Sequence, residues 1–311
     1  MEYIKGFTFA PFAGAGDFDT TEARESLRLM KECTGANFVT FVPGGLQKTA
    51  HSEDILYTTD RTMTDDELCN MIDYAKKLGL RVALKPTVNC MDGTWRAFIS
   101  FFDEDVVCEP KWGNWFKSYT DFQVHYARIA KEHGCELFIA GCELVMSEHR
   151  EKEWRDVIAA IRSVYDGAVS YNTDKYQEHN VSWWDCVDII SSSGYYPLAD
   201  WDRQLDRIEA VVEKYNKPFF FAETGCMSVA GSPEVPNNWE VKGESDLDGH
   251  AVWFDEMLSK CMKRPWLKGV CIWSWSNHLY DEADINNQKN YEVYLKPAER
   301  VINAYYCNKE A

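Results

Sequence analysis

The chain has 311 residues, of which 45% are hydrophobic, and its 33 Lys and Arg are outnumbered by 50 Asp and Glu, for a formal net charge of −17. A chain this acidic repels nucleic acids and anionic membranes, which excludes both as partners, whereas a neutral ligand is compatible with it. No run of about 18 apolar residues exists, so no membrane-spanning helix is predicted.

Short apolar segments rich in β-branched and aromatic residues recur along the chain, and each is followed by a segment with helical periodicity. Strands buried on both faces of a parallel sheet have this composition. We predict strands at residues 4–9, 36–42, 81–88, 136–143, 168–172, 188–196, 218–223 and 269–275. Helices are predicted at 20–35, 64–79, 112–133, 149–165, 201–216, 245–264 and 296–307, with a short or irregular one near 176–186.

Eight strands alternating with about eight helices predict an α/β fold, a (β/α)8 TIM barrel. The competing fold, a doubly wound open sheet, usually has fewer strands, and no GxGxxG motif follows any strand here. No linker, low-complexity stretch or internal repeat interrupts the chain, so residues 1–311 are predicted to form a single catalytic domain.

Three predicted connections from strand to helix are long, at 89–111, 224–244 and 276–295, whereas the connections from helix to strand are short. In such barrels the strand-to-helix loops gather at the C-terminal mouth, where the active site lies. These loops also carry tryptophans and polar side chains, and twelve tryptophans and sixteen tyrosines in all offer flat faces suited to binding sugars.

Two glutamates end apolar runs at this mouth. Glu143 closes the fourth predicted strand and Glu223 closes the seventh, in the stretches FIAGCE and PFFFAE. A single glutamate at a strand end is usually a helix-cap partner or a surface ion pair. A pair on roughly opposite strands of one barrel instead fits glycoside hydrolysis, in which one carboxyl protonates the leaving oxygen and the other attacks the sugar or activates water.

Motifs along nearly the whole chain resemble those of a known family. They are GFTFAPF at the first strand, LKPTVNCMDGTWR at the third, GCEL at the fourth, SGYYPL at the sixth, FAETG at the seventh and WSW at the eighth. This set resembles glycoside hydrolase family 113, the β-1,4-mannanases, within the clan of retaining (β/α)8 glycoside hydrolases. The resemblance implies that Glu143 is the acid/base and Glu223 the nucleophile. It also implies cleavage of β-1,4-mannosidic linkages with retention of anomeric configuration.

One residue departs from the pattern of the clan. Much of the clan has asparagine directly before the acid/base, where its amide can bond the 2-hydroxyl of the sugar, but Cys142 holds that position here. A thiol is a poor substitute for an amide as a hydrogen-bonding group. Specificities of the clan at large therefore transfer weakly to this chain.

Aromatic residues on two strands are candidates for substrate binding. Tyr195 and Tyr196 end the sixth predicted strand, and we favour Tyr195 as the inward one, donating to the nucleophile. Trp273 and Trp275 alternate with Ser274 on the eighth, so both are expected to point toward the barrel axis, with Trp273 as the sugar platform. Packing in the core is the alternative for either pair.

Polar candidates complete the predicted binding site. Lys85 interrupts an apolar strand, and we expect it to point to the mouth and pair with an acid or a sugar hydroxyl. Asn89, Trp95 and Arg96 follow in the next loop and suit hydroxyl bonding and stacking, with a surface ion pair as the alternative for Arg96. Asn172 ends the fifth strand and could bond hydroxyls on the leaving-group side.

Other chemistries lack a motif. The seven histidines show no HxH or HExxH spacing, so no metal site is predicted, and no cofactor is expected. There is no GxSxG elbow or phosphate-binding loop. Two alternatives stay open: another β-glycoside specificity, such as β-glucosidase, xylanase or galactanase, or a carbohydrate-binding barrel without catalysis.

Localisation is predicted from the cysteines and the first residues. Eleven cysteines, an odd number found mostly in apolar contexts, indicate reduced thiols rather than a disulfide framework. The opening MEYIKGFTFAPF lacks the basic and apolar regions of a secretory signal, so a cytoplasmic enzyme is expected unless a leader has been removed. The expected partner is an oligosaccharide or polysaccharide, and the oligomeric state is left open.

Overall fold

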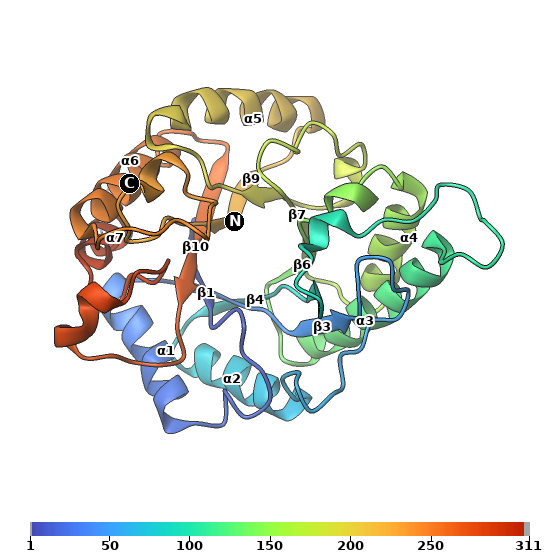
Figure 1. Ribbon diagram of the computed structural model, residues 1–311, viewed down its shortest axis with the longest axis horizontal. Coiled ribbons are helices and arrows are strands. Elements are labelled where there is room, and N and C mark those ends of the chain that lie inside the picture. The colour runs from blue at the N-terminus through green and yellow to red at the C-terminus, as the bar shows by residue number, and fades with distance from the viewer. Residues whose placement is uncertain (1, 308–311) are drawn as a thin grey trace.

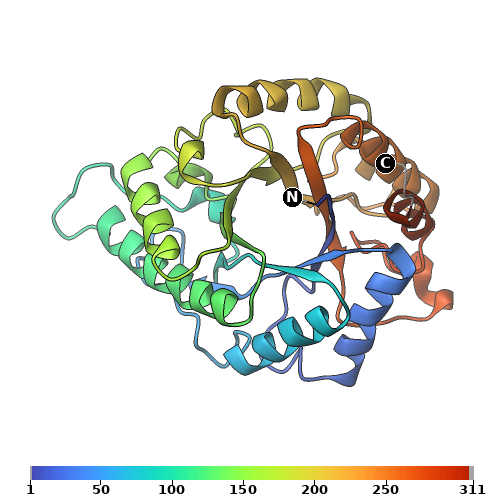
Figure 2. The same ribbon diagram turned by 180° about the vertical axis from the view of Figure 1, so that it is seen from behind.

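Eight parallel strands close into a barrel in the computed structural model, which describes residues 2–307 (Figures 1 and 2). Around the barrel the order is β1, β2, β4, β6, β7, β8, β9 and β10, with β10 pairing back to β1. Their bounds are β1 Ile4–Phe9, β2 Phe38–Phe41, β4 Arg81–Leu84, β6 Leu137–Cys142, β7 Ala168–Thr173, β8 Ile190–Ser193, β9 Phe219–Thr224 and β10 Leu267–Trp275. The predicted (β/α)8 barrel is confirmed.

Helices surround this barrel in the described part of the chain. They are α1 Thr21–Thr34, α2 Asp65–Lys77, α3 Trp112–Glu132, α4 Glu151–Arg162, α5 Trp201–Tyr215, α6 Leu247–Cys261 and α7 Pro297–Cys307. The short segment predicted near 176–186 contains only the 3₁₀ turn Trp184–Cys186. Within residues 2–307, none of the helices combines the length and apolarity that crossing a bilayer requires.

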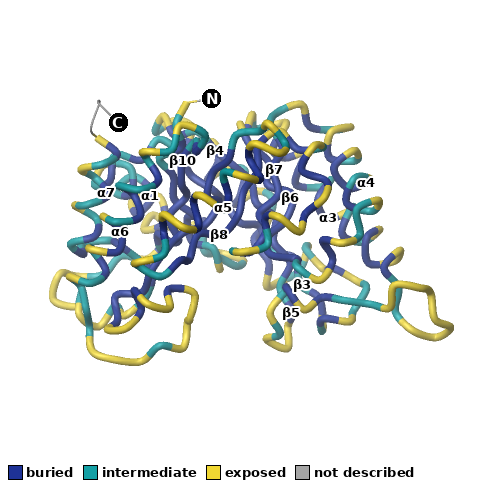
Figure 3. The backbone as a smooth tube through the Cα atoms, turned by 90° about the horizontal axis from the view of Figure 1, so that it is seen from above, coloured by how far each residue is buried: buried dark blue, intermediate teal, exposed yellow. Residues whose placement is uncertain are grey.

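The apolar core has two layers. A small cluster of strand side chains, among them Phe38, Leu137 and Phe220, fills the interior of the barrel. A much larger cluster joins the outer faces of the strands to the helices. Figure 3 shows the buried strands at the centre, with exposed loops extending from one end. The barrel is therefore a packed solid, and space for a ligand lies at the mouth.

The third predicted strand is wrong in its second half. β4 ends at Leu84, and after Pro86 the chain forms a separate strand, β5 Thr87–Cys90. Proline cannot donate a ladder hydrogen bond, which favours the break. β5 pairs with β3 Gly44–Gln47, which was not predicted, in a two-stranded sheet beside the mouth (Figure 3). The connection between β2 and α2, residues 42–64, is consequently a fourth long loop.

Candidate active site

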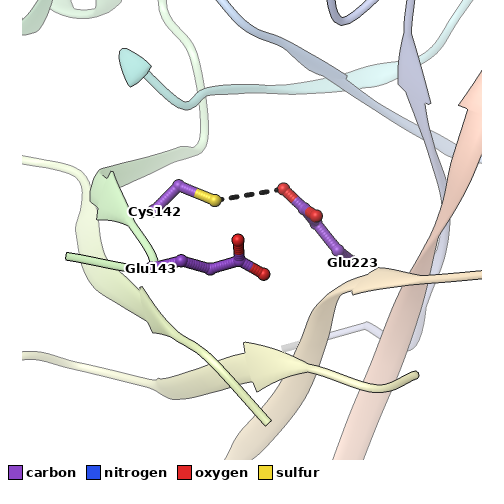
Figure 4. A group of neighbouring side chains, drawn as sticks. All are labelled: Cys142, Glu143 and Glu223. Atoms are coloured by element: carbon purple, nitrogen blue, oxygen red, sulfur yellow. Dashed lines mark hydrogen bonds between the residues drawn. The ribbon is translucent and has the colours of Figure 1, made fainter. Parts of the chain in front are cut away.

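The carboxylates of Glu143 and Glu223 face each other across the barrel mouth (Figure 4). Glu223 belongs to β9, and Glu143 directly follows β6. One oxygen of each carboxylate and the sulfur of Cys142 all lie within 4.8 Å of one another. Glu223 is 4% exposed and Glu143 is 7% exposed. Two acids 80 residues apart in sequence thus bring their carboxylates close together at the mouth of the barrel.

A register shift in the barrel turns the Glu223 side chain toward this gap. Ala222 packs inside the barrel with Phe220, so strict alternation would send Glu223 outward. The pairing of β8 with β9 shifts between Ser192 and Ser193, which re-aims the end of the strand. The pairing of β6 with β7 shifts likewise between Ile139 and Cys142.

The chain leaves β6 through a left-handed turn. Gly141 has φ +113° and Glu143 has φ +52°. A Cβ atom at residue 141 would lie 2.2 Å from the Tyr119 hydroxyl oxygen, so only glycine fits there. The Glu143 backbone N–H donates to the carbonyl of Asn172 at 2.7 Å, which fixes the turn against β7.

Glu223 is surrounded by hydrogen-bond donors. The Lys85 ammonium and the Cys142 thiol donate to Oε1, the thiol at 3.2 Å, and the Tyr195 hydroxyl donates to Oε2 at 3.0 Å. Burial raises the pKa of Glu223, but the charge and hydrogen bond of Lys85 more than offset it, with help from Arg96 and Cys142. The pKa therefore lies below its ordinary value, and this carboxylate stays ionised.

Glu143 has a different set of partners. Its Oε2 accepts hydrogen bonds from the Trp95 indole at 3.1 Å and from Arg96 at 3.3 Å. Its Oε1 accepts from the Ser193 hydroxyl at 2.6 Å. Arg96 is shared, because it also donates to the carbonyl of Val88 and to Asn89 Oδ1. The two carboxylates are therefore held in separate environments.

A cavity of about 500 Å³ opens where β1 and β10 reach the mouth, and neither Glu143 nor Glu223 belongs to its wall. Trp273 forms part of its wall, and the Lys85 ammonium lies 5.4 Å from the centre of the Trp273 ring. Trp239 and Tyr291 pack against each other near Trp273, with their ring centres 4.4 Å apart and their planes tilted by 43°. The polar residues of the wall include Asp17, Asn277, Lys289, Asn290 and Glu292. Flat aromatic faces rimmed by hydrogen-bonding groups suit a pyranose.

Two aromatic candidates were predicted wrongly. Tyr196 is fully buried and donates to Glu178 on the outer side of β8. Trp275 is 1% exposed, and its indole donates to Ser26 of α1. The pairing of β1 with β10 shifts between Thr8 and Phe9, so Trp273 and Trp275 do not share a face.

Two polar candidates act within the protein rather than on a ligand. Lys85 and Asn172 have no exposed surface, so the predicted contact of Asn172 with a sugar hydroxyl is wrong. Lys85 does pair with an acid, Glu223, as one of its two predicted options. Asn172 donates to Ser193 at 3.1 Å and thereby lies behind the hydroxyl that binds Glu143.

The remaining candidates line the mouth. Trp95 is 41% exposed, which leaves a face free beside Glu143. Asn89 and Arg96 are partly buried and bonded to each other. Their contacts with substrate stay predictions.

Several site residues were not predicted. Ser193 is the last of three consecutive serines, and nothing in the sequence distinguishes it from its neighbours. Tyr291 and Trp239 lie in the long loops already assigned to the mouth, so an aromatic residue in such a loop was the available signal. Cys142 was noted only for the asparagine it replaces, whereas its thiol bonds the opposite carboxylate.

Cys142, Glu143 and Glu223 resemble a metal-binding cluster in their spacing alone. Two positive charges already lie on the carboxylates, Lys85 on Glu223 and Arg96 on Glu143. Burial raises the pKa of the Cys142 thiol well above its ordinary value, so the thiolate that a metal requires is disfavoured. This donor set fits acid–base chemistry better than a cation.

Comparison with known proteins gives a consistent assignment. The sequence model of Glycoside Hydrolase Family 113 matches residues 7–296. A solved complex structure of a GH113 β-1,4-mannanase is 53% identical in sequence and superposes with a TM-score of 0.98. The match covers 99% of this chain and 100% of the mannanase chain. The GH113 β-mannanase AaManA from Alicyclobacillus acidocaldarius, in complex with ManMIm, is 40% identical over 99% of this chain and 98% of its own, with a TM-score of 0.95.

More distant matches share only the fold. A β-glucuronidase from Ruminococcus gnavus is 14% identical over 98% of this chain and 50% of its own, with a TM-score of 0.65. None of the curated protein sequences matches this chain.

Proposed function

This chain belongs to glycoside hydrolase family 113, and from that membership we propose that it hydrolyses β-1,4-mannosidic linkages in mannan or manno-oligosaccharides with retention of configuration. The observation that carries the mechanism is the approach of the Glu143 and Glu223 oxygens to within 4.8 Å. Retaining enzymes hold their carboxyl groups about 5–5.5 Å apart, whereas inverting enzymes leave room for a water at about 6.5–9.5 Å.

In the first step the glycosidic bond is exchanged for an ester. A Glu223 oxygen attacks the anomeric carbon while Glu143 gives its proton to the departing glycosidic oxygen. Glu223 suits this role because Lys85 keeps it ionised, and the Tyr195 hydroxyl holds its second oxygen in place. The products are a shortened sugar chain and a mannosyl ester on Glu223.

In the second step water breaks the ester. Glu143, now a carboxylate, takes a proton from a water molecule, and the resulting hydroxide attacks the anomeric carbon and releases Glu223. Glu143 stays in reach of the reacting atoms because Arg96, Trp95 and Ser193 hold its carboxyl group opposite Glu223. Two inversions give net retention.

The wall of the cavity supports a sugar substrate. Trp273, Trp239 and Tyr291 line the cavity with aromatic rings, and uncharged polar groups such as Asn277 are available for hydrogen bonds. Trp273 also lies 5.4 Å from the ammonium of Lys85, which pairs with Glu223. A neutral oligosaccharide also meets no repulsion from a chain of net charge −17. Action inside the cell on imported oligosaccharides stays a prediction.

Following the anomers during hydrolysis tests this proposal. In proton NMR of mannohexaose digestion, we expect the β-anomer of the new reducing end to appear first and the α-anomer only later, by mutarotation. Initial release of the α-anomer would establish inversion and overturn the double displacement. Faster turnover of cello-, xylo- or galacto-oligosaccharides than of manno-oligosaccharides would overturn the specificity, and binding without any turnover would identify a non-catalytic barrel.

A further inference from the structure

A buried glutamate that touches neither carboxylate is tied to the acid/base turn. Glu148 lies five residues after Glu143, just after the 3₁₀ turn Val145–Ser147, and is 3% exposed. In the described part of the chain it forms no ion pair. Burial raises its pKa to about 8, even though two side-chain hydrogen bonds lower it. Such a group is costly to retain without a purpose.

The hydrogen bonds of Glu148 lead back to the catalytic turn through one phenol. The Tyr171 hydroxyl donates to Glu148 Oε1 at 2.9 Å and accepts from the backbone N–H of Leu144 at 3.1 Å. The Thr173 hydroxyl donates to the same Glu148 oxygen at 2.6 Å. Because the phenol O–H points to Glu148 as a hydrogen-bond donor, a lone pair of the Tyr171 oxygen is left to accept from Leu144.

Leu144 directly follows Glu143, whose left-handed backbone needs support. A non-glycine residue in this conformation is strained and persists only when its surroundings fix it. Two hydrogen bonds fix it here: Glu143 N–H to the carbonyl of Asn172, and Leu144 N–H to Tyr171. The first belongs to the strand pairing, whereas the second depends on a side chain.

Side chains on both faces of β7 therefore hold Glu143 in place. Tyr171 and Thr173, two residues apart, bind Glu148 on the outer face, where Tyr171 also packs against Trp154 and Trp183. Asn172, between them, donates to Ser193, which donates to Glu143 Oε1. The inner contact orients the carboxylate and the outer contact fixes the backbone that carries it.

We infer that Glu148 and Tyr171 are positioning residues for the acid/base Glu143, acting through the Leu144 N–H. The inference rests on the proposed function, because it assumes that Glu143 transfers protons to the leaving group. Losing the link lets the turn relax, and a displacement of about 1 Å at a proton donor can cost about 10²-fold in rate. The nucleophile, held by Lys85 from another strand, keeps its place.

The test uses the leaving group. We expect Tyr171→Phe to lower kcat/KM on mannotetraose by about 10- to 100-fold, because its sugar leaving group must be protonated. On 2,4-dinitrophenyl β-mannobioside the loss should be much smaller, since dinitrophenolate departs without an acid and kcat/KM reports only the first step. The ratio of the two kcat/KM values is the readout.

A matched control is present in the same barrel. Tyr196 is also a fully buried phenol that donates to a buried glutamate, Glu178, at 3.0 Å, but it touches no backbone group next to a catalytic residue. Tyr196→Phe should lower stability in a similar way and leave the ratio unchanged. Glu148→Gln, which keeps an oxygen as acceptor for both hydroxyls, should retain the parental ratio.

Equal losses on the two substrates, or no loss in Tyr171→Phe, would overturn the inference. Should Tyr171→Phe fail to fold, the same ratio measured in Glu148→Ala decides, because that variant breaks the link without altering the phenol. Failure of the proposed function is distinguishable, since the parent enzyme would then release neither mannose oligomers nor dinitrophenol.

Discussion

Glu223 keeps a negative charge at a place from which water is almost excluded. Burial alone favours the protonated acid, which cannot attack an anomeric carbon. Lys85, which follows β4 on the opposite side of the barrel, reverses the balance through its charge and hydrogen bond, and its side chain is fully buried. The ionised state of Glu223 therefore depends on its pairing with Lys85 and not on the glutamate alone.

Removing that ammonium should be visible in the pH profile. In Lys85→Met, burial of Glu223 is opposed only by weaker partners, so its pKa rises and the acidic limb of kcat/KM moves to higher pH. Each unit of the shift lowers activity below the limb tenfold. An acidic limb that does not move would contradict the assigned role of Lys85.

At the residue scale, the sequence predicted positions better than directions. Glu143, Glu223 and Lys85 were found because each is a charge placed in or beside an apolar run. Tyr195 was correctly favoured over Tyr196 as the inward tyrosine, whereas Trp275 was assigned to the wrong side because alternation holds only in an unbroken ladder, and the ladder shifts near Trp273. Such shifts depend on the pairing of strands that are distant in sequence, so no local pattern reveals them.

At the scale of elements, a capping box stands at the start of α2. The Thr64 hydroxyl accepts from the Glu67 N–H at 3.2 Å, and the Glu67 carboxylate accepts from the Thr64 N–H at 3.0 Å. Two backbone donors that the helix leaves free are thereby satisfied. This start is readable from sequence because every partner lies within four residues.

Truncating the cap should cost stability without affecting chemistry. We expect Thr64→Ala to lower the free energy of unfolding by about 1 kcal/mol, measured by urea denaturation, with kcat unchanged. Thr120→Ala is the matched control, because that hydroxyl lies within α3 and donates to the carbonyl of Phe116. Unfolding midpoints that coincide for Thr64→Ala and the parent would refute the contribution of the cap.

Other elements could not be read locally. β3 has the sequence GGLQ, and two glycines give no strand signal, so the loop between β2 and α2 hid a strand that pairs with β5. The left-handed turn at Glu143 also follows a residue, Cys142, that the strand pattern treats as regular. Both features owe their form to tertiary pairing at the mouth.

At the scale of the whole molecule, eight repeated strand-and-helix units were sufficient to predict the barrel. The prediction succeeded because buried parallel strands are apolar throughout, which makes each one visible without knowledge of its neighbours.

The net charge of −17 gives a further expectation. Self-repulsion of so many carboxylates opposes the compact state, and salt screens it over a Debye length of about 10 Å at 0.1 M. Raising NaCl to about 0.5 M should therefore raise the Tm, while kcat/KM for uncharged mannotriose stays constant. A steep dependence of kcat/KM on salt would indicate recognition of a charged ligand instead.

The proposed division of labour, in which Glu223 attacks the anomeric carbon and Glu143 protonates the glycosidic oxygen, is tested most directly by trapping the covalent intermediate. Treatment with 2-deoxy-2-fluoro-β-mannosyl fluoride, followed by intact-mass measurement and peptide mapping, should find one fluorosugar on Glu223, with inactivation in proportion to labelling. Glu223→Gln should stay unlabelled. Labelling at another residue, or inactivation without any adduct, would contradict the account.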